Sequence, residues 1–363
     1  MSRLALLITA LCFCPALANL RAQAPAKASP TPTTAPEPSA TPTTRALIDS
    51  MDSADLKEAI QLLKSNYIKP ESLSETELSR AAFEGILTRL GRGVVLLSSA
   101  NAEPAVPAYS EILDGHVGYL RLGVLNKVNL DALDSNLQNL AGKKVDAVVL
   151  DFRASPASND FAVAAEFAKR FCPKDKPLFT LHKTTARQEK SFTSDRDPSY
   201  QGLIIILADG DTAGAAEAVA GDIHLYNKAV VIGQQTAGRA VEYSDLKLPS
   251  GKVLRVAVGE AVLPEGRPLF PGGLKPDVSV EMPAADKREV FQASREKGMT
   301  PFIVENSRPH LNEAALISGK NPELEAMEAA QKRKTAPEKS GVHDPVLQRA
   351  LDLVTSIGIF EKK

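Results

Sequence analysis

The stretch LIIILADGDTAGAAEAVAGDI, residues 203–223, decides how this chain folds. Its first six residues form an uninterrupted apolar run, which is typical of a strand buried on both faces of a parallel sheet. Residues 209–211 favour a turn, and the alanine-rich residues after them favour a helix over 212–223. A buried strand that leads through a short turn into a helix is the repeating unit of an α/β domain.

The same alternation continues on both sides of this stretch. Helical periodicity also marks residues 46–67, 77–90, 131–140 and 161–171, and strand-like segments occupy 117–122, 145–152, 178–183, 230–233, 253–258 and 261–263. Strands that alternate with helices predict an α/β fold with a largely parallel sheet.

Three motifs resemble those of the C-terminal processing, or tail-specific, serine peptidase family. Where that family has Ser-Ala-Ser-Ala-Ala-Glu, residues 212–217 read Thr-Ala-Gly-Ala-Ala-Glu. Where it has Thr-Phe-Gly-Lys-Gly, residues 236–240 read Thr-Ala-Gly-Arg-Ala, and residues 273–278 resemble its closing Gly-Ile-x-Pro-Asp-Val. The resemblance covers residues 50–360. It implies a coiled, mostly parallel sheet of the Clp-protease/crotonase-like kind with helical N- and C-terminal arms.

The resemblance places Gly214 and Arg239 at the two catalytic positions, which in the family are the serine nucleophile and the lysine base. Glycine has no side chain to attack a carbonyl, and arginine stays protonated in proteins and offers no lone pair. Tyr243 stands where the family often has a glutamine that orients the lysine. We therefore expect no catalytic residue at these degenerate positions and predict a hydrolytically inactive protein.

Two further segments, residues 157–158 and 211–212, belong to the expected cleft. Ala157 and Ser158 replace paired glycines whose backbone helps to form the family's oxyanion hole, so a turn with positive φ is not expected here. Asp211 and Thr212 are expected to cap the following helix. The resemblance makes the following residues candidates for a vestigial ligand-binding cleft: Ala157, Asp211, Thr212, Gly214 and Arg239.

Two classes of function remain open. The first is a binding or scaffold protein whose cleft holds a peptide C-terminus or an apolar ligand, as the family's vertebrate retinoid-binding repeats hold theirs. Arg239 would then pair with a ligand carboxylate, or alternatively lie in an internal salt bridge. The second class is an active serine-type endopeptidase with a displaced nucleophile, for example Thr212. The sequence predicts no cofactor and no metal, because no pair of its five histidines has ligand spacing.

The chain divides into five predicted parts. Residues 1–18 have the pattern of a secretory signal peptide, with Arg3 before an apolar run and a small-residue cleavage site at 16–18, although a retained anchor is an alternative. A Pro/Ala/Thr-rich linker follows over 19–45. Next come an N-terminal helical segment over 46–100, the α/β core over 115–283 and a C-terminal helical segment over 284–363. We expect export to the periplasm, the cell surface or the medium, with no transmembrane span after cleavage.

Composition and length limit the partners. With a net charge of −1, 5% aromatic residues and no tryptophan, nothing indicates a nucleic-acid partner. Between Ser99 and Gly115, where the family inserts a PDZ domain that captures substrate tails, only about fifteen residues are present, too few for a domain. An oligomer, or a heteromer with an active paralogue, stays open.

Overall fold

The computed structural model describes residues 43–99, 106–184, 189–303 and 342–361. The chain forms two compact units, residues 1–78 and 79–363, each described here by itself. The predicted signal peptide and nearly all of the predicted linker lie outside the described residues. Among the residues that are described, no helix is both long and apolar enough to span a bilayer.

The N-terminal unit is helical. It contains α1 (Thr44–Asp49), α2 (Ser53–Asn66), the 3₁₀ turn η1 (Pro70–Leu73) and the start of α3 (Glu75–Leu90). The single helix predicted over 46–67 is therefore two helices. Asp52 causes the break, because its carboxylate accepts hydrogen bonds of 2.8 Å from the backbone N–H groups of Ala54 and Asp55 and so starts α2.

The second unit contains a mostly parallel sheet in the order β12-β8-β7-β4-β3-β2. Strands β12, β8, β7, β4 and β3 pair in parallel, and β2 pairs with β3 in the antiparallel sense. The strand bounds are β2 (Tyr109–Leu113), β3 (Val117–Arg121), β4 (Ala147–Asp151), β7 (Leu203–Ala208), β8 (Val230–Gly233) and β12 (Val278–Ser279). The predicted α/β fold with a largely parallel sheet is confirmed.

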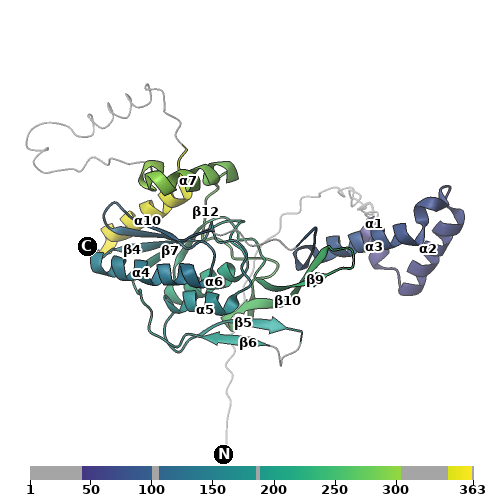
Figure 1. The fold of residues 1–363 in the computed structure, drawn as a ribbon, viewed down its shortest axis with the longest axis horizontal. Coiled ribbons are helices and arrows are strands. Elements are labelled where there is room, and N and C mark those ends of the chain that lie inside the picture. Colours follow the sequence, from purple (N-terminus) through teal and green to yellow (C-terminus); the bar gives the residue numbers. More distant parts are fainter. Residues whose placement is uncertain (1–42, 100–105, 185–188, 304–341, 362–363) are drawn as a thin grey trace, which may run out of the picture. The chain divides into compact units, whose positions relative to one another are not determined.

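Helices cover both faces of this sheet, which explains why the central strands β4 and β7 are apolar along nearly their whole length. Val148 and Leu150 of β4 belong to the core that includes residues of α4 (Lys127–Lys143), α5 (Phe161–Lys169) and α6 (Ala215–Asn227). Ala147 and Val149 point the other way, into the core shared with α7 (Ala284–Lys297) and α10 (Pro345–Glu361). Figure 1 shows α4, α5 and α6 on one side of β4 and β7, and α7 and α10 on the other.

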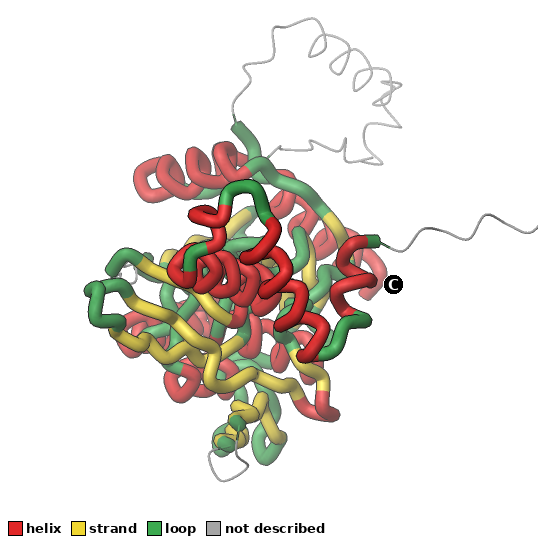
Figure 2. The backbone as a smooth tube through the Cα atoms, turned by 90° about the vertical axis from the view of Figure 1, so that its right-hand side faces the viewer, coloured by secondary structure: helices red, strands yellow, loops and turns green. Residues whose placement is uncertain are grey.

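A second, antiparallel sheet is built around the long strand β10 (Val253–Leu263), which pairs with β1, β5, β9 and β11. The predicted strands 253–258 and 261–263 are merged in β10, with an irregular register between Ala257 and Gly259. The remaining bounds are β1 (Val94–Leu97), β5 (Pro177–Lys183), β6 (Lys190–Thr193), β9 (Val241–Lys247) and β11 (Arg267–Pro268). Figure 2 shows the strands of the second unit together with the helices that cover them.

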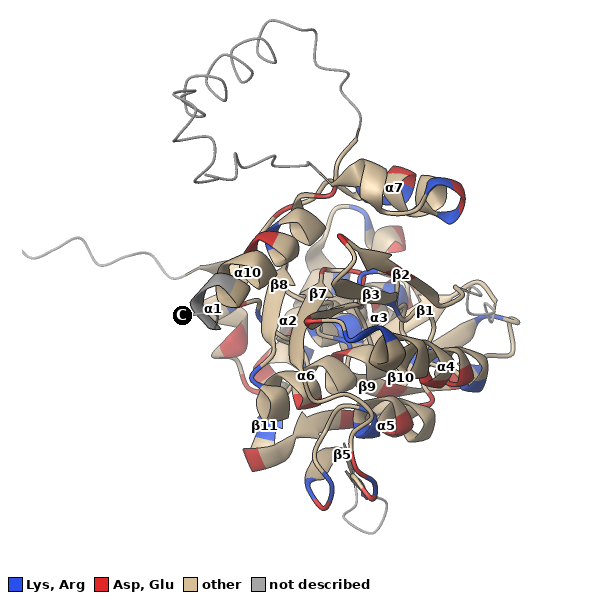
Figure 3. Ribbon diagram, turned by 90° about the vertical axis from the view of Figure 1, so that its left-hand side faces the viewer, with Lys and Arg blue, Asp and Glu red and all other residues tan. Residues whose placement is uncertain are grey.

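The C-terminal arm is fastened to the parallel sheet by a buried ion network. The Arg153 guanidinium, just past the end of β4, contacts Asp151 at 2.7 Å and Asp344 at 2.8 Å, and all three side chains are almost fully buried. Asp344 also accepts hydrogen bonds from the backbone N–H groups of Val346 and Leu347 and so caps the last helix. Elsewhere acidic and basic residues are interspersed, as along α4 and α7 in Figure 3.

Candidate functional site

The site is centred on the start of α6, where Gly214 is the N-cap residue with φ 65° and ψ −132°. A positive φ of this size is strained for a residue with a side chain and free for glycine. The helix thus begins three residues later than its predicted start at 212, and the expectation that Asp211 and Thr212 cap it is wrong. Glu217 completes the cap, because its Oε2 accepts a 3.1 Å hydrogen bond from the Gly214 N–H.

The Thr212 side chain is buried, whereas the Asp211 side chain is exposed and is held by an ion pair. The Thr212 hydroxyl is buried; it donates to the Phe152 carbonyl at 3.0 Å and accepts from the Asp209 N–H at 3.1 Å. The ammonium group of Lys287 on α7 binds Asp211 at 2.6 Å and Asp209 at 2.5 Å. These contacts hold the turn against α7, and neither Thr212 nor Asp211 lines the pocket described below.

The segment that contains Ala157 and Ser158 lies directly against Gly214. The Ser158 carbonyl accepts a 3.3 Å hydrogen bond from the Ala215 N–H. A Cβ atom added to Gly214 would lie 3.0 Å from that carbonyl oxygen and 3.1 Å from the Ala157 Cα, closer than most Cβ contacts. As expected, neither Ala157 nor Ser158 has a positive φ. The space next to the nucleophile position is therefore filled by this chain's own backbone.

Glu217 holds the loop 236–239, which carries Arg239, against the start of α6. It is fully buried, and its carboxylate accepts from the Thr236 hydroxyl at 2.5 Å and from the N–H groups of Gly238 and Arg239 at 2.7 Å each. Burial raises the pKa of Glu217, and these hydrogen bonds oppose that shift.

The sequence placed Glu217 in the family motif without assigning it this positioning role. Its spacing three residues after the N-cap was the available signal.

Arg239 is half-buried, and among the described residues no carboxylate lies within ion-pair distance of its guanidinium. The internal salt bridge considered for it is thus not found in the described part of the chain. The Tyr243 phenol lies within the field of three guanidinium groups: burial raises its pKa, and the positive charges of Arg239, Arg255 and Arg92 oppose the shift. These arginines therefore gather around one side chain.

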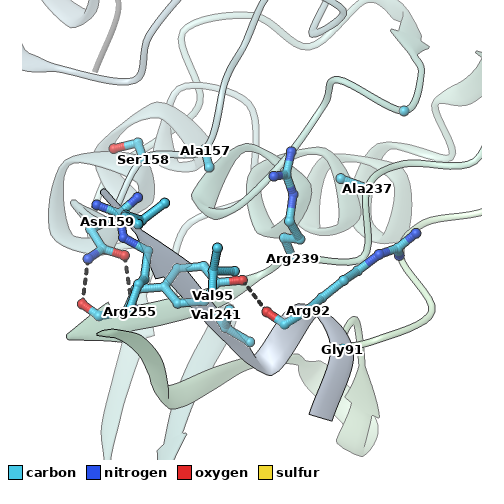
Figure 4. A pocket seen from close by; sticks show the side chains of 13 residues that line it. Gly91, Arg92, Val95, Ala157, Ser158, Asn159, Ala237, Arg239, Val241 and Arg255 are labelled. Carbon is cyan, nitrogen blue, oxygen red and sulfur yellow. Dashed lines mark hydrogen bonds between the residues drawn. The ribbon is translucent and has the colours of Figure 1, made fainter. Parts of the chain in front are cut away.

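Arg239 lines a pocket of about 590 Å³ between β1, β9 and the loop 157–159 (Figure 4). No aspartate or glutamate lines it; its lining is Gly91, Arg92, Val95, Leu97, Ala157, Ser158, Asn159, Gly210, Ala237, Arg239, Val241, Tyr243 and Arg255. Of the candidate cleft residues, the structure brings Ala157 and Arg239 together here. The wall from β1 and β9 is apolar, and the charged groups on it are cationic.

The pocket wall is fixed by hydrogen bonds to Tyr243. The Asn159 amide donates to the Tyr243 carbonyl at 2.7 Å and accepts from the Tyr243 N–H at 2.9 Å. The Tyr243 hydroxyl donates to the Arg92 carbonyl at 2.7 Å, and both sets of bonds are drawn in Figure 4. Within the described residues no group of three or more potential metal ligands occurs.

The sequence of this chain is similar to those of known proteins. Residues 116–280 match the sequence profile of Peptidase family S41. Carboxy-terminal processing protease CtpA of Bacillus subtilis is 22% identical over 246 residues, which cover 68% of this chain and 50% of the relative. Carboxyl-terminal-processing peptidase 1, chloroplastic, of Arabidopsis thaliana is 29% identical over 191 residues, which cover 52% of this chain and 38% of the relative. The chain spans half or less of the length of these relatives.

Among solved structures, the photosystem II D1 C-terminal processing protease matches 52% of this chain and 48% of its own, at 20% identity and a TM-score of 0.39. A lipoprotein from Streptococcus agalactiae matches 66% of this chain and 88% of its own, at 16% identity and a TM-score of 0.42.

The parallel sheet, and the strand, turn and helix that present Gly214, define a serine-peptidase-like α/β domain. Residues 116–280 match peptidase family S41, and the chain is similar to the C-terminal processing peptidases.

Proposed function

We propose that this protein is an exported, hydrolytically inactive member of its family that holds a peptide C-terminus in the former catalytic cleft. The observation that carries the proposal is the pairing of an absent nucleophile side chain at Gly214 with an arginine, Arg239, at the base position. A Ser–Lys hydrolase needs an oxygen nucleophile, a neutral amine and free donors for the oxyanion. Each of these requirements meets an obstacle in this site.

The backbone at the start of α6 also supports the proposal that the protein is hydrolytically inactive. The N–H groups nearest to the nucleophile position are engaged, Gly214 with Glu217 and Ala215 with the Ser158 carbonyl. Donors that are already bonded within the chain are not preorganised to stabilise an oxyanion. The pocket does contain one serine hydroxyl, that of Ser158, which accepts from the Asp160 N–H at 3.2 Å. No general base pairs with it among the described residues, so the alternative of an active endopeptidase has no specific observation in its favour.

Binding is supported by the chemistry of the pocket. The guanidinium of Arg239 has donors for a bidentate contact with a carboxylate and no carboxylate partner in the described chain. Val95, Leu97 and Val241 offer an apolar wall beside it. The cavity of about 590 Å³ falls in the range of about 300–1,000 Å³ that is usual for ligand pockets. A ligand with a carboxylate next to apolar side chains would match both the guanidinium of Arg239 and the apolar wall.

Two measurements test this proposal. A serine-reactive fluorophosphonate probe should leave the protein unlabelled under conditions in which an active serine peptidase is labelled. Fluorescence anisotropy should show that a short apolar peptide with a free C-terminal carboxylate binds, and that its C-terminal amide binds about five- to tenfold more weakly, the value of one partly exposed charge-assisted contact. Covalent labelling would refute inactivity, and equal affinity for acid and amide would refute carboxylate capture.

Export is tested separately. Expression of the full chain followed by cell fractionation and N-terminal sequencing should place the mature protein outside the cytoplasm, beginning at Asn19. A cytoplasmic protein that keeps residues 1–18 would contradict this part and leave the cleft proposal intact.

A further inference from the structure

The pocket carries more positive charge than a single ligand carboxylate would balance. Three arginines line it, Arg92, Arg239 and Arg255, and no acidic residue does. Arg255 is balanced by Asp245, which it contacts at 2.7 and 2.8 Å. Arg92 and Arg239 have no carboxylate at ion-pair distance among the described residues. The lining therefore holds two guanidinium groups whose charge is uncompensated.

The Arg92 guanidinium lies beside the loop that carries Arg239. The Arg92 guanidinium donates to the Pro271 carbonyl at 3.2 Å, and its Nη1 lies 2.8 Å from the point where a Cβ of Gly238 would stand. Gly238 directly precedes Arg239 in the chain. Both guanidinium groups also act electrostatically on the Tyr243 phenol, which places their charges at the same part of the pocket.

We propose that the cleft selects peptides whose last residue is aspartate or glutamate, so that Arg239 binds the α-carboxylate and Arg92 binds the side-chain carboxylate. This inference rests on the proposed function and adds the identity of the terminal residue. Two like charges on one wall repel each other, and a ligand with two carboxylates relieves the repulsion of both. Inorganic phosphate also carries two charges, but it offers nothing to the apolar wall of Val95, Leu97 and Val241.

The test uses the full-length protein and four fluorescent peptides with the same apolar body. They end in glutamate or glutamine, each with a free or an amidated terminus. Loss of either charge from the doubly charged peptide should raise the Kd about five- to tenfold. The R92Q variant should lose the preference for glutamate over glutamine and keep the preference for acid over amide, and R239Q should do the reverse. R288Q, at an exposed position on α7, is the matched control and should bind like the parent protein.

The outcomes separate this inference from the proposed function. Equal affinity for the free glutamate and glutamine peptides would overturn the inference and leave carboxylate capture standing. No saturable binding of any peptide would overturn both. If R92Q and R239Q weakened all four peptides equally, the assignment of one carboxylate to each arginine would be wrong. Competition by free glutarate or phosphate with the affinity of the peptide itself would exclude a peptide as the preferred ligand.

Discussion

The buried carboxylate of Glu217 accepts a 2.7 Å hydrogen bond from the backbone N–H of Arg239, which joins the start of α6 to the loop that carries the former base position. The bond involves the main chain of Arg239, so it is independent of the side chain at that position. The same carboxylate also binds Thr236, Gly238 and Gly214. Glu217 thus holds the loop 236–239 against the start of α6 through contacts that do not depend on the side chains at positions 214 and 239.

Replacement of Glu217 by alanine is expected to lower the free energy of unfolding by about 3 kcal/mol, because several buried donors would lose their acceptor and a cavity would form. It should also abolish binding of carboxylate peptides, since Arg239 would no longer be held at the pocket. Urea denaturation and anisotropy measure the two effects. The matched control E289A, at an exposed glutamate of α7, should change the free energy of unfolding by less than about 0.5 kcal/mol. A stable E217A variant that binds normally would contradict the positioning role.

Restoring the two catalytic residues is not expected to restore hydrolysis. In G214S/R239K the new Cβ would press on Ala157 and Ser158, and the Ala215 N–H would still be bonded to the Ser158 carbonyl. The double variant should remain unlabelled by a fluorophosphonate probe, and strain at the positive φ should lower its free energy of unfolding by about 1–3 kcal/mol.

The variant G214A is the control for this experiment, because it adds the Cβ without a hydroxyl. It should be destabilised about as much as G214S/R239K, which would attribute the loss of stability to the backbone conformation at position 214 and the contact with residues 157–158. Labelling of G214S/R239K at the new serine would show that the segment 157–158 can move aside and that inactivity depends on the two substitutions alone.

The fold could be predicted from the sequence because its central strands have a local signature. The uninterrupted apolar runs of β4 and β7 report burial on both faces, and helical segments separate them. The exact start of α6 could not be predicted in this way. Asp211 and Thr212 are good caps by composition, but Lys287 from α7 and the Phe152 carbonyl, both distant in sequence, engage them instead. Tertiary contacts of this kind are invisible to a local pattern.

The residues of the candidate site could likewise be predicted only in part from the sequence. The family motifs pointed to Ala157, Arg239 and Tyr243, which line the pocket, and to Gly214 at the start of α6, because each stands at a fixed place in a short stretch of sequence. The contribution of Arg92, Val95 and Leu97 was missed, since β1 reaches the pocket only through its pairing with β10. Antiparallel pairing over more than 150 residues of sequence leaves no local signal.

A third prediction concerns the C-terminal arm. In D344A, the Arg153 guanidinium would keep Asp151 and lose Asp344, and the last helix would lose its cap. Breaking one side of a buried ion network of this kind costs roughly 3–5 kcal/mol, so D344A should unfold at markedly lower urea concentration. The exposed-site variant E289A again serves as the control. An unchanged midpoint would mean that the arm contributes little to the stability of the domain.

The fourth prediction is a pH dependence at Asp222 of α6, a buried carboxyl that accepts one hydrogen bond, from the Phe179 N–H at 3.2 Å, and has its second oxygen unpaired. Burial raises its pKa well above the ordinary value of 3.8. Well below pH 3.8 the carboxyl is protonated in both the folded and the unfolded protein, so its ionisation does not change the free energy of unfolding. As the pH rises toward the folded pKa, the carboxyl ionises first in the unfolded chain, and the free energy of unfolding falls. The neutral variant D222N escapes this loss. Its free energy of unfolding should exceed that of the parent by on the order of 1 kcal/mol or more at pH 7, and the difference should shrink as the pH is lowered to 4. Urea titrations of both proteins at several pH values measure this difference, and a difference that does not vary with pH would show that folding does not raise the pKa of Asp222.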